Sequence, residues 1–175
     1  MSGEFSIYLE TKKYKTRYRT EFITITGDVE SVIKKSGVKR GIIVIQTHHT
    51  TCGIWVNENE RNLIGPSEEL GYMSDLQKVL DNFANPASEY GHNDIYHAEN
   101  KGGKRNTHLC PPDENGVINE CINGHAHAQA MMLQSSVSLI IEDKRLLKGN
   151  WQEIMLVELD HDRERSVSFL ISGEK

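Results

Sequence analysis

Three histidines come from well separated segments of the chain, at His49, His92 and His127. A neutral imidazole is the commonest transition-metal ligand, and three imidazoles with one open position form a catalytic zinc geometry. We therefore expect these three side chains to be candidate ligands of zinc or another divalent metal. The alternative is a hydrogen-bonded polar pocket without metal. The spacing favours that alternative, because no HExxH motif occurs and His125 and His127 diverge on a helix.

Two carboxylates and two arginines follow the histidines at strand-like spacing. Glu158 and Asp160 are two residues apart, which places them on one face of a strand. Carboxylates held side by side push their pKa values apart, so one becomes a proton acceptor near neutral pH. The alternative is an exposed sheet edge that deters aggregation. Arg163 and Arg165 have the same spacing and would match a phosphate, or else form exposed ion pairs.

Other polar segments carry weaker signals. His48 and His49 are flanked by threonines, but no Gly-x-Ser-x-Gly elbow accompanies them, so covalent catalysis is disfavoured. The run KGGKR at residues 101–105 has phosphate-friendly composition without P-loop spacing, and we interpret it as a flexible loop. Trp151 follows Gly149 at the start of a strand, where a large ring is more typical of a core than of a ligand platform.

Hydrophobic periodicity predicts the elements that must position these groups. Strands are expected at residues 5–9, 17–26, 41–46, 54–57, 137–142, 151–159 and 166–172. Helices are expected at residues 27–36, 70–83 and 125–134, with Gly37 ending the first and Ser74 as the N-cap of the second. The first two strands suit a pair with each other. The order predicts an α+β fold with mostly antiparallel strands.

Length and composition exclude several classes of protein. A chain of 175 residues suits one domain, and a net charge of -5 argues against a nucleic-acid partner. Three cysteines without CxxC spacing argue against a disulfide framework and a structural zinc site. No run of eighteen apolar residues or signal-peptide layout is present, so we expect a cytoplasmic protein without a membrane partner.

The ordered motifs resemble the YjbQ-like family, often labelled secondary thiamine-phosphate synthase. They cover nearly the whole chain from residue 41 onward. They are HTT at 49–51, VNENE at 56–60, Asp75, YGHND at 90–94, NGHAH at 123–127, GNWQEI at 149–154 and ELDHDRER at 158–165. Three departures stand out: a long insertion at about 99–122, His161 in place of a glycine after Asp160, and Lys148 before Gly149.

The resemblance implies one YjbQ-like domain over residues 1–175, folded as a bent two-layer β-sandwich with a few helices and assembled as a homotrimer. It also implies a weak thiamine-phosphate synthase that joins a pyrimidine-methyl diphosphate to a thiazole phosphate. The implied catalytic residues are Glu158, Asp160 and His127, and the implied metal ligands are His49, His92 and His127. The implied substrate-binding residues are Thr50, Thr51, Asn57, Asn123, Trp151, Arg163 and Arg165.

Two other functions remain open at the level of the sequence. The same pocket would serve a non-catalytic binding protein for a small phosphorylated metabolite or a metal ion. A purely structural trimer would need the histidines only for stability. Turnover separates the first two, because an enzyme accumulates product beyond its own concentration and a binder stops at one equivalent.

Overall fold

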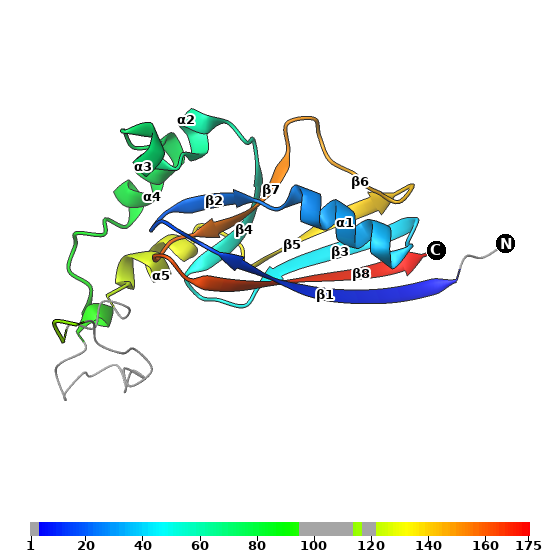
Figure 1. The fold of residues 1–175 in the computed structure, drawn as a ribbon, viewed down its shortest axis with the longest axis horizontal. Helices are drawn as coiled ribbons and strands as arrows, with labels where there is room; N and C mark the ends of the chain where they lie inside the picture. Colours follow the sequence, from blue (N-terminus) through cyan, green and yellow to red (C-terminus); the bar gives the residue numbers. More distant parts are fainter. Residues whose placement is uncertain (1–3, 95–113, 117–121) are drawn as a thin grey trace.

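The computed structural model describes residues 4–94, 114–116 and 122–175. Two sheets form the framework (Figure 1). Sheet A has the order β1 (Phe5–Lys15), β8 (Glu164–Glu174), β3 (Arg40–Thr47), β5 (Ser136–Glu142) and β6 (Arg145–Leu146). Sheet B has the order β2 (Glu21–Thr24), β7 (Glu153–Glu158) and β4 (Cys52–Asn57). Every strand pair within the two sheets is antiparallel, so the predicted α+β sandwich is confirmed.

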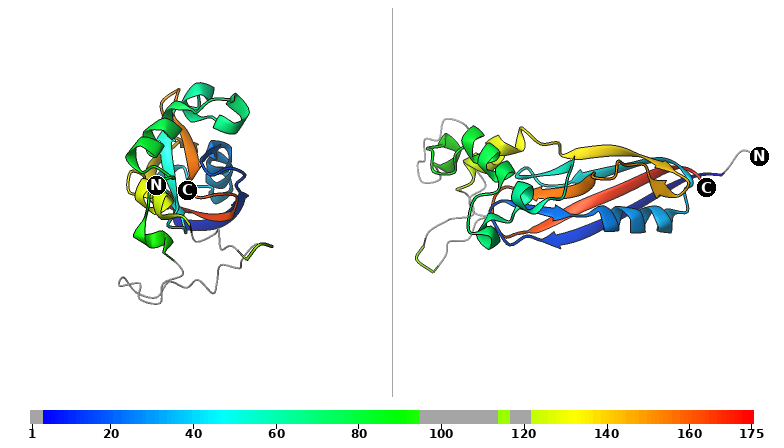
Figure 2. Two further views of the ribbon diagram at one scale, coloured as in Figure 1. Left: turned by 90° about the vertical axis from the view of Figure 1, so that its left-hand side faces the viewer. Right: turned by 90° about the horizontal axis from the view of Figure 1, so that it is seen from above.

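Six helical segments complete the described part of the chain. They are α1 (Thr26–Ser36), α2 (Arg61–Ile64), α3 (Ser67–Leu70), α4 (Asp75–Phe83), the 3-10 turn η1 (Gly91–Asn93) and α5 (Gly124–Ala130). Helix α1 ends as predicted at Gly37, whose φ of 72° is left-handed and natural for glycine. Figure 2 shows α2 to α5 gathered toward one end of the molecule, while the long strands run to the other end.

The main core lies between the inner face of sheet A, sheet B and α1. Strand β8 alternates strictly, so Val167, Phe169 and Ile171 all point inward and are fully buried. Val29 and Val32 of α1 pack into the same cluster. The alternation of β8 therefore determines which of its side chains belong to the core and which face outward.

Sheet B is covered on both faces. Ile154 and Leu156 of β7 face the main core, whereas Met155 and Val157 belong to a second apolar cluster beneath α2, α4 and α5. Because β7 is buried on both sides, its chain can present a group to a ligand only at its two ends. This constraint decides where the functional side chains lie.

The outer face of sheet A carries exposed apolar side chains. Cross-strand register places Leu9 opposite Leu170 and Leu170 opposite Val44, while Ile42 lies opposite Ile140. Leu9, Ile42, Ile140 and Leu170 are all exposed. We call Leu9, Ile42, Val44, Ile140 and Leu170, together with Ile7, the outer face of sheet A. A contiguous exposed apolar surface of this kind marks an interaction site.

Two predictions about the first strands are wrong. The expected strand at 17–26 shrinks to β2, because Arg17 donates its backbone N–H to the Glu21 carboxylate at 2.6 Å and closes a turn. The first two strands also do not pair with each other. Strand β1 pairs with β8 in sheet A, and β2 pairs with β7 in sheet B.

Two predicted helices are shorter than expected. The expected helix at 125–134 ends at Ala130, since the Gln134 carbonyl accepts the Ile54 N–H at 2.8 Å and is drawn to the edge of β4. The expected helix at 70–83 begins only at Asp75, after Gly71 adopts a φ of 77°. Ser74 does occupy the N-cap position.

The predicted insertion at 99–122 lies almost entirely outside the described residues. Among the helices that the structure describes, none has the length and apolar character needed to cross a membrane.

Candidate functional site

A buried ion pair lies at the end of β7 and the beginning of β8. Glu158 is fully buried and Arg165 is 3% exposed. Arg165 donates from Nε to Glu158 Oε2 and from Nη2 to Glu158 Oε1, both at 2.5 Å, which makes the contact bidentate. Burial by itself would lower the pKa of Arg165, but the hydrogen bonds and charge of Glu158 outweigh it and raise that pKa. The guanidinium therefore stays charged.

Glu158 also shapes the turn that follows β7. Its Oε1 atom accepts the backbone N–H groups of Leu159 at 3.0 Å and Asp160 at 2.9 Å. With Arg165 and two backbone donors around it, this carboxylate positions other groups and does not lie on an exposed sheet edge. The predicted proton acceptor at residue 158 is thus occupied by structural partners.

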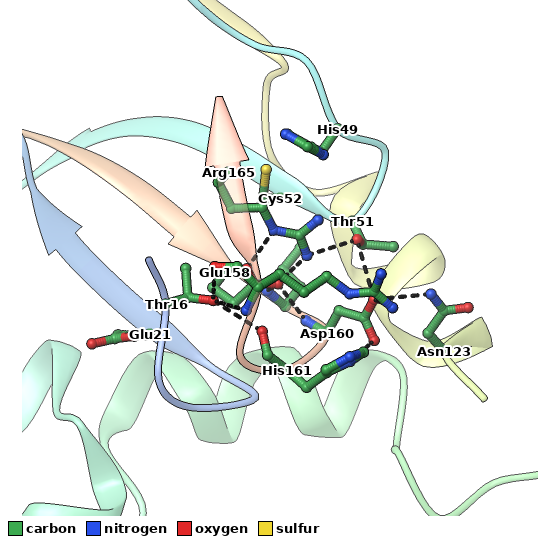
Figure 3. A network of polar contacts seen from close by, with 12 residues as sticks. Thr16, Glu21, His49, Thr51, Cys52, Asn123, Glu158, Asp160, His161 and Arg165 are labelled. Atoms are coloured by element: carbon green, nitrogen blue, oxygen red, sulfur yellow. Dashed lines mark hydrogen bonds and ion pairs between the residues drawn. The ribbon is translucent and has the colours of Figure 1, made fainter. Parts of the chain in front are cut away.

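Asp160 is the centre of the polar network that faces away from the core (Figure 3). Its Oδ2 atom accepts from Asn123 Nδ2 at 2.9 Å and lies 3.0 Å from Arg163 Nη2. Its Oδ1 atom lies 2.9 Å from His161 Nδ1. Asp160 therefore brings a guanidinium and an imidazole to one carboxylate.

Thr51 links Asp160 to Arg165, the partner of Glu158. Its hydroxyl accepts from Arg165 Nη2 at 3.0 Å and points to Asp160 Oδ2 at 3.5 Å. Thr51 immediately precedes β4, so the network ties β4, the β7–β8 turn and α5 together. Thr50, its neighbour, is exposed in the preceding turn.

His49 packs over the Arg165 side of this network (Figure 3). Its Nε2 atom accepts the backbone N–H of Ser166 at 2.9 Å, which places the ring proton on Nδ1. Burial and then the positive charge of Arg165 lower the pKa of His49, so the neutral ring is favoured. Nε2 of this histidine is therefore engaged by the backbone of β8.

The other two predicted ligands do lie together. The ring centroids of His92 and His127 are 4.5 Å apart, with the planes at 68°. His127 is one helical turn after Asn123, and Asn93 Oδ1 accepts the Gly124 N–H at 2.8 Å to fix η1 against α5. Helix α5 thus carries both the Asn123 contact to Asp160 and the His127 contact to His92.

The fit to a metal is incomplete in this arrangement. Among the described residues, no three His, Cys, Asp or Glu side chains converge into a group that could hold a metal ion. His92 and His127 supply two adjacent imidazoles, whereas Nε2 of His49 accepts from Ser166. A three-histidine zinc site therefore does not describe this geometry.

Asn57 and Trp151 lie away from the network around Asp160. In the β4–β7 register Cys52 is opposite Glu158 and Asn57 is opposite Glu153, a separation of roughly 17 Å along the strands. The sequence context of Trp151 suggested a place in the core. This prediction is wrong, because the Trp151 side chain is 75% exposed. It lines a hollow of about 370 Å³ with Glu58, Asn59, Glu60, Asn150 and Glu153. The predicted substrate-binding residues thus form two clusters.

Two structural supports were not foreseen from the sequence. Thr16 accepts the Arg163 N–H at 2.7 Å and donates toward the His161 carbonyl at 3.0 Å, which holds the β7–β8 turn. A single threonine at the end of a polar strand gives no sequence signal for this role. Gly124 did have a sequence signal, since it lies in the NGHAH motif. The structure gives the reason for glycine there, because a Cβ at this position would lie 2.5 Å from Tyr90 Cβ.

His125 points into the interior beside the network. It is buried, and its Nε2 atom has no hydrogen-bond partner among the described residues. Burial, followed by the charge of Arg19, lowers the pKa of His125, while a hydrogen bond to the backbone of Leu159 partly opposes the shift. The folded protein therefore holds this ring neutral.

Replacing Glu158 with Gln leaves the Arg165 charge buried without its carboxylate. We expect Glu158→Gln to lower the free energy of unfolding by about 3–5 kcal/mol, measured by urea denaturation. The matched control is Glu164→Gln, which breaks an exposed pair with Lys13 and costs at most about 1 kcal/mol. Equal losses in the two variants would contradict the structural role of the buried pair.

The stability of the protein should fall in mild acid because of His125. The pKa of His125 in the folded state lies below the ordinary value of 6.5. Just below pH 6.5 the His125 ring therefore binds a proton in the unfolded chain but stays neutral in the folded chain. The contribution of the neutral ring is complete above that value and is lost as pH falls through it, with a slope of up to about 1.4 kcal/mol per pH unit. His125→Gln removes this contribution. The urea midpoint of His125→Gln should vary less than that of the wild-type protein between pH 7 and 5. Above pH 8 the midpoints of the two proteins should depend on pH in the same way.

Comparison with known proteins places the chain among relatives of the same length. Residues 10–174 match the model of the family described as UPF0047 protein YjbQ-like. A UPF0047 protein of Methanocaldococcus jannaschii is 32% identical, with 92% of this chain and 91% of the relative covered. A UPF0047 protein of Methanothermobacter thermautotrophicus is 26% identical, with 96% and 94% covered.

Solved structures agree with these sequence matches. A YbjQ-like protein of unknown function from Sulfolobus solfataricus has a TM-score of 0.75 and 30% identity, with 98% of this chain and 100% of that chain covered. A hypothetical protein from Aeropyrum pernix has a TM-score of 0.71 and 26% identity, with 95% and 99% covered. The resemblance seen in the motifs is confirmed, and the protein belongs to the YjbQ-like UPF0047 family.

Proposed function

We propose that the chain binds a small phosphorylated metabolite in a pocket formed by His92, His127, His161 and Arg163, which we call the His/Arg pocket. The observation that carries the proposal is the contact of both Arg163 and His161 with the buried Asp160. A guanidinium offers five N–H donors in a planar fork and can bind Asp160 and a phosphate oxygen at once. The proposed ligand is thus an anion held by a guanidinium and an imidazole that Asp160 positions.

The charges around the network support an anionic ligand. Glu158 is compensated by Arg165, and Asp160 is contacted by Arg163, so the two carboxylates and two guanidiniums sum to zero. Neither carboxylate of the network is left unpaired to repel an anion beside Arg163.

The reaction we propose for this pocket is a low-efficiency thiamine-phosphate synthesis from phosphorylated pyrimidine and thiazole precursors. In that reaction the bond between the pyrimidine methylene carbon and a diphosphate oxygen breaks, and the thiazole ring nitrogen forms a bond to the same carbon. The electron pair of the broken bond leaves with the diphosphate. Arg163 and an imidazole N–H would stabilise the charge that develops on that leaving group. Asp160, through its contacts with Arg163 and His161, would keep both in place.

Pyrophosphate is the probe that tests the pocket. We expect isothermal titration to show binding to the wild-type protein and a loss of about 10–100-fold in Arg163→Gln, because a hydrogen bond to a charged group contributes about 1.5–3 kcal/mol. Arg40→Gln is the matched control, since Arg40 is exposed and pairs with Glu142 outside the pocket. Wild-type protein that does not bind pyrophosphate would overturn the proposal.

Turnover then decides between the enzyme and the non-catalytic binding protein. With both phosphorylated precursors present, an enzyme forms thiamine phosphate in excess of its own concentration. A binding protein for the same metabolites retains at most one equivalent, and Arg163→Gln abolishes that retention without any product appearing.

A pocket that holds zinc or another divalent metal is the second candidate, and the adjacent rings of His92 and His127 favour it. We expect metal analysis of the untagged protein to separate it from the anion pocket. One metal per chain, lost in His127→Ala, would support the metal site. At least one of its ligands would then come from outside the described residues. Metal-free protein that still binds pyrophosphate would leave the anion pocket as the function.

We also propose that the chain assembles as a homotrimer, with the outer face of sheet A as its main contact. Leu9, Ile42, Ile140 and Leu170 form an exposed apolar surface there. Burying such a surface against another copy contributes about 25 cal/mol per Å². The assembly would shelter side chains that a single copy leaves in water.

A further inference from the structure

The two clusters of predicted site residues cannot meet within one chain. Trp151 precedes β7 and Asp160 follows it, and the whole length of this buried strand lies between them. Figure 1 shows the β6–β7 connection, residues 147–152, rising above sheet B and away from α5. A ligand in the His/Arg pocket would therefore not touch the indole of the same copy.

The turn that carries Trp151 is held by contacts among its neighbours. Gln152 donates its N–H to the Gly149 carbonyl at 3.1 Å, and its side-chain Oε1 accepts the Gly149 N–H at 2.8 Å. Lys148 pairs with Glu153 at 3.1 Å across the base of the same turn. An exposed aromatic ring carried on an ordered turn has the composition and placement of an interface hot spot.

The hollow beside the indole is rich in carboxylates, whereas the His/Arg pocket contains a guanidinium. The hollow beside Trp151 is lined by the carboxylate-bearing residues Glu58, Glu60 and Glu153. The pocket at the other end of β7 presents Arg163 and His161. An indole face attracts a guanidinium, and nearby carboxylates add to that attraction.

We propose that Trp151 of one copy completes the His/Arg pocket of a second copy. The inference rests on the proposed pocket and assembly and deepens both. Contact between two different surfaces of the same chain is heterologous, and such contacts close into a ring when the rotation permits. The indole then forms an aromatic wall beside Arg163 of the second copy. The ligand class is a phosphate ester that carries an aromatic heterocycle, with the phosphate at Arg163 and the ring stacked on Trp151.

The first test uses the fluorescence of Trp151 and needs no ligand. Trp55→Phe leaves Trp151 as the only tryptophan. In the assembled protein we expect its emission to be blue-shifted and protected from acrylamide, and Arg163→Gln in the same background to change that emission. Within one chain the two residues are too far apart for such a change. Sedimentation equilibrium gives the mass of the assembly.

The second test mixes two defective chains. Trp151→Ala and His127→Ala homo-oligomers should each bind thiamine phosphate, a phosphate ester that carries an aromatic heterocycle, at least 10-fold more weakly than the wild-type protein. Chains co-expressed at equal levels should regain about a quarter of the wild-type sites, because one neighbouring pair in four joins an intact His127 to an intact Trp151. Leu147→Ala, an exposed apolar change in the same connection, should keep full binding.

The outcomes separate this inference from the proposed function. A fully acrylamide-accessible Trp151 in a protein that binds pyrophosphate would overturn the shared site and leave the pocket standing. No recovery in the mixed assemblies would overturn the shared site as well. A protected Trp151 that responds to Arg163→Gln, in a protein that does not bind pyrophosphate, would support the contact between copies and overturn the anion pocket.

Discussion

The buried pair of Glu158 and Arg165 is the interaction on which the site depends. Two charges removed from water cost several kcal/mol each, and they persist in a core only with near-ideal geometry and satisfied hydrogen bonds. Here the geometry is bidentate, and the second lone pairs of Glu158 accept two backbone N–H groups. The pair thereby fixes the path of the chain at the exact point where it leaves sheet B and enters sheet A.

Two successive sets of contacts extend from that pair and position the rest of the site. Glu158 holds the backbone of Asp160, and the Asp160 carboxylate in turn contacts Arg163, His161 and the amide of Asn123. Asn123 precedes α5, so the position of His127 follows from the same contacts. The proposed His/Arg pocket would therefore meet an anion with little reorganisation, which is what electrostatic stabilisation of a leaving group requires.

Periodicity was sufficient to predict the faces of the elements but not their partners. Helix α1 could be predicted because Val29, Val32 and Ile33 repeat at helical spacing and Gly37 ends the helix. The spacing of Glu158 and Asp160 predicted a shared location, but nothing in the local sequence indicated that Arg165 would occupy the Glu158 carboxylate. The sheet assignment of β2 was missed for the same reason, since an alternating pattern does not specify which strand lies alongside. Long-range contacts settled each of these points.

The exposure of Trp151 follows from the burial of sheet B. Strand β7 is covered by α1 and sheet A on one side and by α2, α4 and α5 on the other, so no residue along it can reach a ligand. Polar and aromatic groups attached to this strand must gather at its two ends, where Glu158 leads to Asp160 and Glu153 follows Trp151. A fold that buries its central strand so completely separates its recognition groups by the length of that strand. In the proposed assembly, contact between copies is the route by which such groups would meet.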